Sequence, residues 1–173
     1  MSTTDAAAFV VVGLGNPLMG DDGVGLSALR QLDAGWTFDD SLQLVDGGTW
    51  GLKLLPALEG AEGIIFFDAV RSGEPPGTVV ELRGDEIPRR LATKLSTHQV
   101  DLREVLALMS LRGTLPSRVS VVGVEPAFVD MSAALSPTVA SRTADVVALA
   151  IDRLRAWGVC CTQRTEAAHP CTK

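Results

Sequence analysis

Short runs of apolar residues, many of them β-branched, alternate along the chain with segments whose apolar residues recur at helical spacing. This alternation is typical of an α/β protein with a parallel sheet. The predicted strands span residues 9–13, 42–45, 63–67, 78–82 and 119–124. The first, third and fifth of these are apolar almost throughout, which is typical of strands covered by helices on both faces.

Two helices are predicted from a continuous apolar face. One follows the first strand, and the other begins at a capping box formed by Ser96 and Gln99. Their apolar residues recur three and four positions apart, as one face of a helix requires. The two faces consist of Val24, Ala28, Leu29 and Leu32 in the first helix and Leu102, Val105, Leu106 and Met109 in the second.

Two further helices are predicted from signals at their ends and within them. Ser136 followed by Pro137 is typical of a helix start, and the apolar pattern continues from there until Gly158 ends it. We therefore expect one uninterrupted helix in this region. Another helix is expected after Thr49, broken or bent at Pro56 because proline lacks the backbone donor.

Composition fits a single domain. Of the 173 residues, 46% are hydrophobic and 21% charged, which is enough apolar material for one core and excludes disorder as the main state. We expect this domain to span residues 8–158, with a disordered N-terminus over 1–7 and a flexible tail over 159–173. The three cysteines, Cys160, Cys161 and Cys171, lie in that tail without CxxC spacing, so we expect neither a disulfide framework nor a zinc site.

Charge and hydropathy limit the partners. The net charge of −6, without a basic stripe, argues against nucleic acid, because phosphate contacts require lysine and arginine. The longest apolar run, residues 9–14, is far shorter than the ~20 residues of a membrane span. No basic region precedes it as in a signal peptide. We expect a cytoplasmic protein that binds neither nucleic acid nor membrane, and nothing in the sequence requires a dimer, so we expect a monomer.

Acidic residues follow the strongest predicted strands. The carboxyl ends of strands in an open α/β sheet form the crevice where such proteins place their sites. A histidine, His98, lies in the first turn of the capping-box helix. Two carboxylates and one imidazole would form a mixed set of ligands for a divalent transition metal. The acids are Asp21 and Asp22 after the first strand, Asp46 after the second, Asp68 after the third and Glu125 after the fifth.

Each of these residues also has a structural interpretation. Asp21 or Asp22 could cap the following helix, and Asp46 could hold the turn before two glycines. A lone histidine near a helix start is more often a capping or core residue than a ligand. Asp68 is harder to explain structurally, since a carboxylate after four large apolar residues is costly to bury unless a positive or hydrogen-bonding group meets it.

Two other catalytic motifs are not supported. Gly13 and Gly15 suggest a dinucleotide fingerprint, but Leu18 occupies the position of its third glycine. Asp21 and Asp22 would also repel a phosphate at that helix start. The chain has no GxSxG motif for nucleophilic catalysis.

Five segments, in order and with consistent spacing, resemble the nickel–iron hydrogenase maturation endopeptidases. The similarity extends from about residue 8 to residue 158. The matching segments are residues 12–25 (VGLGNPLMGDDGVG), 46–49 (DGGT), 67–69 (FDA), 97–99 (THQ) and 122–126 (VGVEP).

The resemblance implies a fold, an activity and a set of site residues. The fold would be a single α/β domain of the phosphorylase/hydrolase-like kind, with a twisted, mostly parallel five-stranded sheet sandwiched between helices. The activity would be removal of a C-terminal extension from the hydrogenase large-subunit precursor after nickel insertion. The metal-contacting and catalytic positions would fall on Asp22, Asp68 and His98, with Gly23 and Gly25 favouring Asp22 over Asp21 for the first acid.

A mechanism follows from these residues as a hypothesis. Nickel already bound in the precursor would also be met by Asp22, Asp68 and His98, so that the precursor supplies the metal and no organic cofactor is needed. The metal would serve as recognition element and would polarise the scissile carbonyl or activate water. Alternatively, a carboxylate would act as general base.

Two other functions compete with this one. The first segment also resembles the opening of peptidyl-tRNA hydrolases, but those continue with a tyrosine and a basic segment, whereas this chain has no tyrosine and has Gly20-Asp21-Asp22 there. A non-catalytic protein that senses nickel-loaded precursor would use the same ligands. The sequence does not discriminate this second alternative from a protease.

Overall fold

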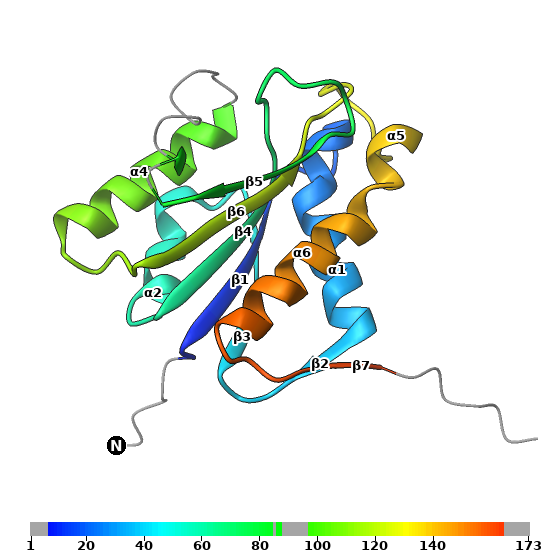
Figure 1. Cartoon of the computed structure of the whole chain (residues 1–173). Coiled ribbons are helices and arrows are strands. Elements are labelled where there is room, and N and C mark those ends of the chain that lie inside the picture. The colour runs from blue at the N-terminus through cyan, green and yellow to red at the C-terminus, as the bar shows by residue number, and fades with distance from the viewer. Residues whose placement is uncertain (1–6, 85, 88–96, 165–173) are drawn as a thin grey trace, which may run out of the picture.

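A five-stranded sheet forms the centre of the molecule (Figure 1). The computed structural model describes residues 7–84, 86–87 and 97–164, with only the backbone for 97–101. The strand order is β3-β1-β4-β6-β5, with β1, β3, β4 and β6 parallel and β5 antiparallel to β6. The expected α/β sheet is therefore confirmed. Its strands are β1 (Phe9–Leu14), β3 (Leu42–Gly48), β4 (Gly63–Ala69), β5 (Val79–Arg83) and β6 (Arg118–Val124).

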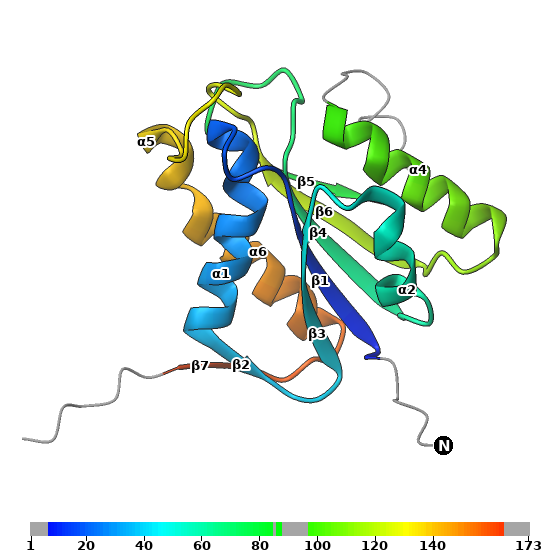
Figure 2. The same ribbon diagram turned by 180° about the vertical axis from the view of Figure 1, so that it is seen from behind.

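Helices cover both faces of the sheet (Figures 1 and 2). One face packs against α1 (Val24–Gly35) and α6 (Thr143–Ala156). The other packs against α4 (Thr97–Leu111) together with η2 (Gly51–Leu54) and α2 (Leu55–Leu58). The apolar faces predicted for the first helix and the capping-box helix are buried as expected. Ser96 of the capping box lies outside the described residues.

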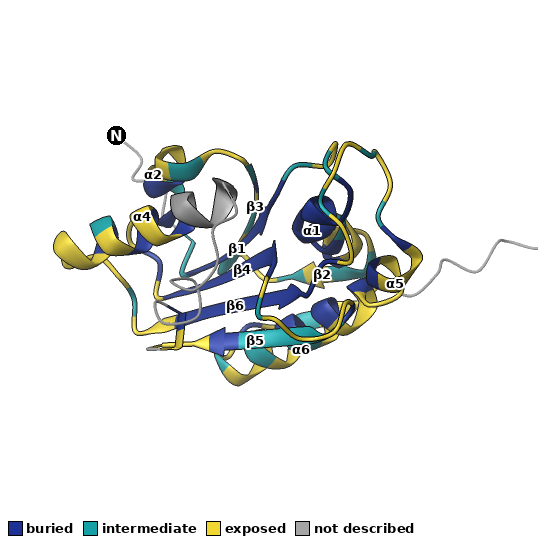
Figure 3. Ribbon diagram, turned by 90° about the horizontal axis from the view of Figure 1, so that it is seen from above, coloured by how far each residue is buried: buried dark blue, intermediate teal, exposed yellow. Residues whose placement is uncertain are grey.

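The central strands alternate their side chains between the two helical layers. In β4, Ile65 and Phe67 belong to the core on the α1/α6 side, whereas Ile64 and Phe66 belong to the core on the α2/α4 side. Viewed from above, β1 and β4 are buried along their length, and β6 is buried after its first residue (Figure 3). Because successive residues of a strand point to opposite faces, Asp68 lies on the α4 side of the sheet.

The helix expected from Pro137 to Gly158 is divided in two. The structure has α5 (Pro137–Ala140) followed by α6 rather than one continuous helix. Ser141 and Thr143 each donate a side-chain hydroxyl to a carbonyl three residues back, at 2.9 Å, and such bonds compete with the helical backbone pattern. The ends are as predicted, since Ser136 accepts from the Val139 amide and Gly158 has a left-handed φ of 96°.

The helix after Thr49 is short. It consists of η2 and α2, and Pro56 occupies a first-turn position of α2, where its missing donor costs no hydrogen bond. The proline is therefore accommodated at the beginning of α2 and does not interrupt a longer helix. Among the described residues, no helix is long and apolar enough to cross a membrane.

Residues expected in a flexible tail form a strand. β7 (Cys161–Gln163) pairs antiparallel with β2 (Trp36–Phe38) in a separate two-stranded ribbon at the foot of the molecule (Figure 1). Val159 is buried in the core on the α1/α6 side, and this anchors the segment. The prediction of a tail without regular structure is thus wrong for 161–163, and the predictions for 1–6 and 165–173 lie outside the described residues.

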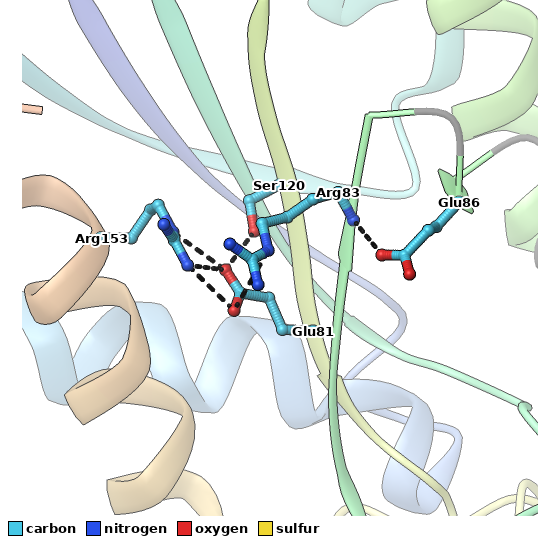
Figure 4. A network of polar contacts seen from close by, with 5 residues as sticks. All are labelled: Glu81, Arg83, Glu86, Ser120 and Arg153. Atoms are coloured by element: carbon cyan, nitrogen blue, oxygen red, sulfur yellow. Dashed lines mark hydrogen bonds and ion pairs between the residues drawn. The ribbon is translucent and has the colours of Figure 1, made fainter. Parts of the chain in front are cut away.

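The outermost strand β5 is joined to α6 by a polar network (Figure 4). Glu81 accepts hydrogen bonds from Nε and Nη2 of Arg153 at 3.0 and 3.1 Å and from the Ser120 hydroxyl at 3.1 Å. This two-pronged geometry is the stronger form of an arginine–carboxylate pair. It fixes α6 against the edge of the sheet.

Candidate active site

The carboxyl ends of β1, β3, β4 and β6 lie along one edge of the sheet, because these strands are parallel. The five acidic residues predicted there do lie at or beside this edge, but their environments differ. Asp21, Asp22, Asp68 and Glu125 are buried, whereas Asp46 is exposed and lies inside β3. The structure therefore distinguishes four buried acids from one exposed acid at this edge.

Asp68 is a buried carboxyl near the end of β4. Only 3% of its surface is exposed, and its Oδ1 accepts a hydrogen bond from the Ala69 amide at 2.8 Å. Burial raises the pKa of Asp68 from its ordinary value of 3.8 to about 8, and the negative charge of Asp22 adds to this increase. Near neutral pH, Asp68 therefore holds a proton that an ordinary aspartate would have released.

Asp22 lies in η1 (Gly20–Gly23), the turn between β1 and α1, and is also 3% exposed. Its Oδ2 accepts a hydrogen bond from the Asn16 amide at 2.8 Å. η1 contacts β4, and the negative charge of Asp22 is close enough to raise the pKa of Asp68. The structure thus brings together two of the three predicted site residues.

Two glycines allow this close approach. Gly15 has a left-handed φ of 111°, and a Cβ there would lie 1.8 Å from the Asp22 carbonyl oxygen. At Gly25, in the first turn of α1, a Cβ would lie 2.3 Å from the Phe67 carbonyl oxygen and 2.4 Å from that of Leu14. The glycines of the first segment therefore serve to press η1 and α1 against the ends of β1 and β4.

Asp21 has a different environment from its neighbour. It is completely buried and accepts four hydrogen bonds from the segment 127–136, which follows β6. The Ala127 and Phe128 amides donate to Oδ2 at 2.8 and 3.1 Å, the Ser136 amide to Oδ1 at 2.6 Å and the Ser136 hydroxyl to Oδ2 at 2.9 Å. Asp21 does not act as a side-chain cap of the following helix, one of the interpretations left open by the sequence.

Glu125 holds another loop of the same edge. Its Oε2 accepts hydrogen bonds from the Ser72 amide at 2.6 Å, the Ser72 hydroxyl at 2.8 Å and the Gly73 amide at 2.9 Å. These bonds fasten the loop that follows β4 to the end of β6. Glu125 is therefore engaged in loop structure.

The backbone of α4 places His98 in the first turn of that helix, as the sequence predicts. The loop from α4 to β6 returns the chain to the amino end of the sheet, so the first turn of α4 is the end nearer the acids. The His98 side chain lies outside the described residues. Within the described part of the chain, no three His, Cys, Asp or Glu residues are grouped as a metal site.

Exposed apolar side chains surround this edge, and sequence reasoning missed them. They lie on the segments that follow β1, β3 and β6, and we call them the apolar rim. The pattern of apolar positions marks such residues as core candidates, so only the structure reveals that they face solvent. The apolar rim consists of Leu18, Trp50, Leu52, Phe128 and Met131.

Comparisons with known proteins agree in pointing to one family. A family model described as hydrogenase maturation protease matches residues 26–153. Hydrogenase expression/formation protein HupD of Rhodobacter capsulatus is 40% identical over 152 residues, covering 87% of this chain and 72% of that protein. Hydrogenase 2 maturation protease of Escherichia coli (strain K12) is 32% identical over 161 residues, covering 92% of this chain and 98% of that protein.

Solved structures give the same result. The hydrogenase maturating endopeptidase HybD from E. coli superposes with a TM-score of 0.88 at 31% identity, covering 92% of this chain and 99% of that one. The [NiFe] hydrogenase maturation protease HybD from Thermococcus kodakarensis superposes with a TM-score of 0.70 at 29% identity, covering 83% and 97%.

Proposed function

Because the chain belongs to the hydrogenase maturation protease family, we propose that it is the endopeptidase that removes the C-terminal extension of a nickel–iron hydrogenase large-subunit precursor after nickel insertion. The observation that carries this proposal is the buried pair formed by Asp22 and Asp68. Two acids brought together at low exposure, with one pKa strongly raised, are characteristic of functional sites.

The residues fit a nickel ion that arrives as part of the substrate. Carboxylate oxygens and an imidazole nitrogen are suitable donors for a divalent transition metal. Asp22 and Asp68 would contribute the oxygens, Asp68 after releasing its proton as the metal binds, and His98 of α4 would contribute the nitrogen. Without nickel in the precursor, this set has no cation to hold, so cleavage would wait for metal insertion.

The cleavage step is a hydrolysis. Water adds to the scissile carbonyl, the peptide bond breaks, and the released amine takes up a proton. The nickel brought by the precursor could polarise that carbonyl, or one carboxylate of the pair could accept the proton of the attacking water. In either route, the low exposure of Asp22 and Asp68 strengthens their electrostatic interactions with the reacting groups.

The apolar rim fits a protein substrate. Leu18, Phe128 and Met131 are exposed on the segments that follow β1 and β6, at the same edge of the sheet as the acid pair. Exposed apolar groups at the edge of a site commonly mark protein contact surfaces. We propose that the apolar rim contacts the surface of the precursor around its C-terminal segment.

The test is a mass measurement on the precursor. Purified protein and nickel-loaded large subunit are expected to give a shortened large subunit, whereas nickel-free subunit is expected to stay intact. The Asp68→Ala and His98→Ala variants should be folded but should fail to process the loaded precursor. The matched control is Asp152→Ala, which removes an exposed carboxylate of α6 and should cleave normally.

Two outcomes would reject the proposal. Full processing by the Asp68→Ala or His98→Ala variant would remove these residues from the mechanism. Binding of loaded precursor without any mass change would favour a non-catalytic nickel sensor.

A further inference from the structure

Two segments far apart in the sequence are joined beside the acid pair. Besides accepting four hydrogen bonds at its side chain, Asp21 donates its backbone amide to the Phe128 carbonyl at 3.3 Å. The Gly20 amide donates to the Ser132 carbonyl at 2.8 Å, and the Ser132 amide donates to the Leu18 carbonyl at 3.0 Å. The turn that carries Asp22 is thus attached to the segment 126–136 through backbone and side chain together.

Packing leaves little freedom at this junction. A Cβ at Gly20 would lie 2.4 Å from the Phe128 ring, so the ring rests directly on the turn. Asp21 itself has no exposed surface. The segment 126–136 is therefore packed directly against η1, the turn in which Asp22 lies next to Asp21.

We propose that Asp21 is a positioning residue of the cleavage site: its carboxylate fixes η1 against the segment 126–136 and thereby holds the Asp22 carboxylate beside Asp68. This inference rests on the proposed function, because it concerns the same reaction. Asp21 has no contact with substrate in this role and acts only through its neighbour.

The donor pattern around Asp21 requires a carboxylate. The Ala127 amide, the Phe128 amide and the Ser136 hydroxyl donate to one oxygen, while the Ser136 amide donates to the other. An asparagine has nearly the same shape, but its amide nitrogen is a donor and would face donors at one of these positions. Asp21→Asn therefore keeps the volume of the side chain and removes its acceptor pattern.

The variant Asp21→Asn tests the proposal, with Glu81→Gln as matched control. Glu81 is a partly buried carboxylate that also accepts several hydrogen bonds, but it lies on β5 and binds Arg153 of α6 (Figure 4). This places it on the opposite face of the sheet from Asp68. Cleavage of nickel-loaded precursor is measured at a temperature where circular dichroism shows all proteins to be folded. Amide hydrogen exchange at Ala127, Phe128 and Ser136 reports on the segment independently of cleavage.

Asp21→Asn is expected to lower kcat/KM by about 10- to 100-fold, with a raised KM as well as a lowered kcat, because a displaced catalytic group is costly. Exchange at the three amides should accelerate. Glu81→Gln should keep the wild-type kcat, KM and exchange rates. If Asp21 only stabilised the fold, the kcat of the variant would fall in proportion to its unfolded fraction, and its KM would not change.

The proposal is overturned if folded Asp21→Asn has the wild-type KM. If that variant does not fold, Ser136→Ala takes its place, since it removes one donor to Asp21. Ser136 is the N-cap of α5, and Ser141→Ala at the C-cap of the same helix is its control. A wild-type KM for Ser136→Ala would then overturn it. Failure of the wild-type protein to cleave loaded precursor would instead reject the proposed function, so the two failures are distinguishable.

Discussion

Single residues of the same type perform different tasks at the edge of this sheet. Asp21 and Asp22 are neighbours in the chain, yet Asp21 is enclosed by donors from 127–136 and Asp22 influences Asp68. The sequence left both open as capping residues because the partners of Asp21 are more than a hundred positions away. Local patterns carry no information about contacts at such separation.

The sequence predicted the environment of Asp68 more fully than that of the other acids. A carboxyl after four apolar residues was expected to need a positive or hydrogen-bonding partner. Among the described residues, the structure provides one hydrogen bond, from the Ala69 amide, and a second acid, Asp22, whose negative charge raises the pKa of Asp68 further. The carboxyl is accommodated by keeping its proton, which is why its pKa lies near 8 and not near 3.8.

The raised pKa of Asp68 predicts how stability depends on pH. Between about pH 4 and pH 8 the folded state holds a proton on Asp68 that the unfolded state has lost, so the free energy of unfolding falls as pH rises through this range. The side chain introduced by Asp68→Asn cannot ionise, so the free energy of unfolding of this variant does not fall for this reason over the same range. Denaturant unfolding of the variant should therefore show greater stability than wild type at pH 8, by on the order of 1–4 kcal/mol, and a smaller difference at pH 4.

The comparison of the two pH values provides the internal control. A constant difference between the variant and the wild type would mean that packing, and not ionisation, is responsible. A difference that decreases with rising pH would contradict the raised pKa of Asp68.

At the scale of elements, apolar periodicity predicted the strands and the helical faces well. It did so because the central strands and the helices bury large, regular surfaces, as in β4 and α1. It failed for the break between α5 and α6, where hydroxyl side chains compete for backbone carbonyls. It also failed for β7, whose three residues are too few to show a period and whose pairing with β2 is not local.

Close packing of α1 on the sheet predicts opposite effects for two substitutions in one helix. Gly25→Ala would place a Cβ against the Phe67 and Leu14 carbonyl oxygens and should destabilise the protein by about 1–3 kcal/mol or more. It should also reduce cleavage, because α1 follows directly on η1. Gly35→Ala, at the other end of α1, meets no atom within 4 Å and should raise stability by up to about 1 kcal/mol.

Thermal or denaturant unfolding of both variants measures these effects. Equal stability changes in the two variants would show that helix propensity alone determines the outcome. They would contradict the close approach of α1 to the strand ends.

At the scale of the whole molecule, the candidate site and the β2–β7 ribbon lie at opposite ends of the sheet (Figure 1). The site end combines buried acids with the exposed apolar rim, and the ribbon end is anchored by buried Val159. We therefore expect substitutions at the site end to affect substrate binding and substitutions at the ribbon end to affect stability.

Met131 and Val159 provide this test. Met131→Asp changes a side chain that is 87% exposed, so it should alter stability by no more than about 0.5 kcal/mol but should raise KM for the precursor. Val159→Ala removes buried methyl groups and should cost about 1–3 kcal/mol while the folded enzyme keeps its kcat and KM. Exposed Thr162→Ala on β7 should alter neither property.

An unchanged KM for Met131→Asp would show that Met131 does not contribute to binding the precursor. A raised KM for folded Val159→Ala would show that the two ends are not independent.

The bond between Asp21 and Ser136 also has a consequence for biosynthesis, because 115 positions of the chain separate the two residues. Joining groups so distant in sequence carries an entropic cost of loop closure, which other contacts of the folded chain must offset. A nascent chain on the ribosome lacks Ser136 until most of its length has been made. The hydrogen bonds that join η1 to the segment 127–136 can therefore form only after residues 127–136 have been synthesised.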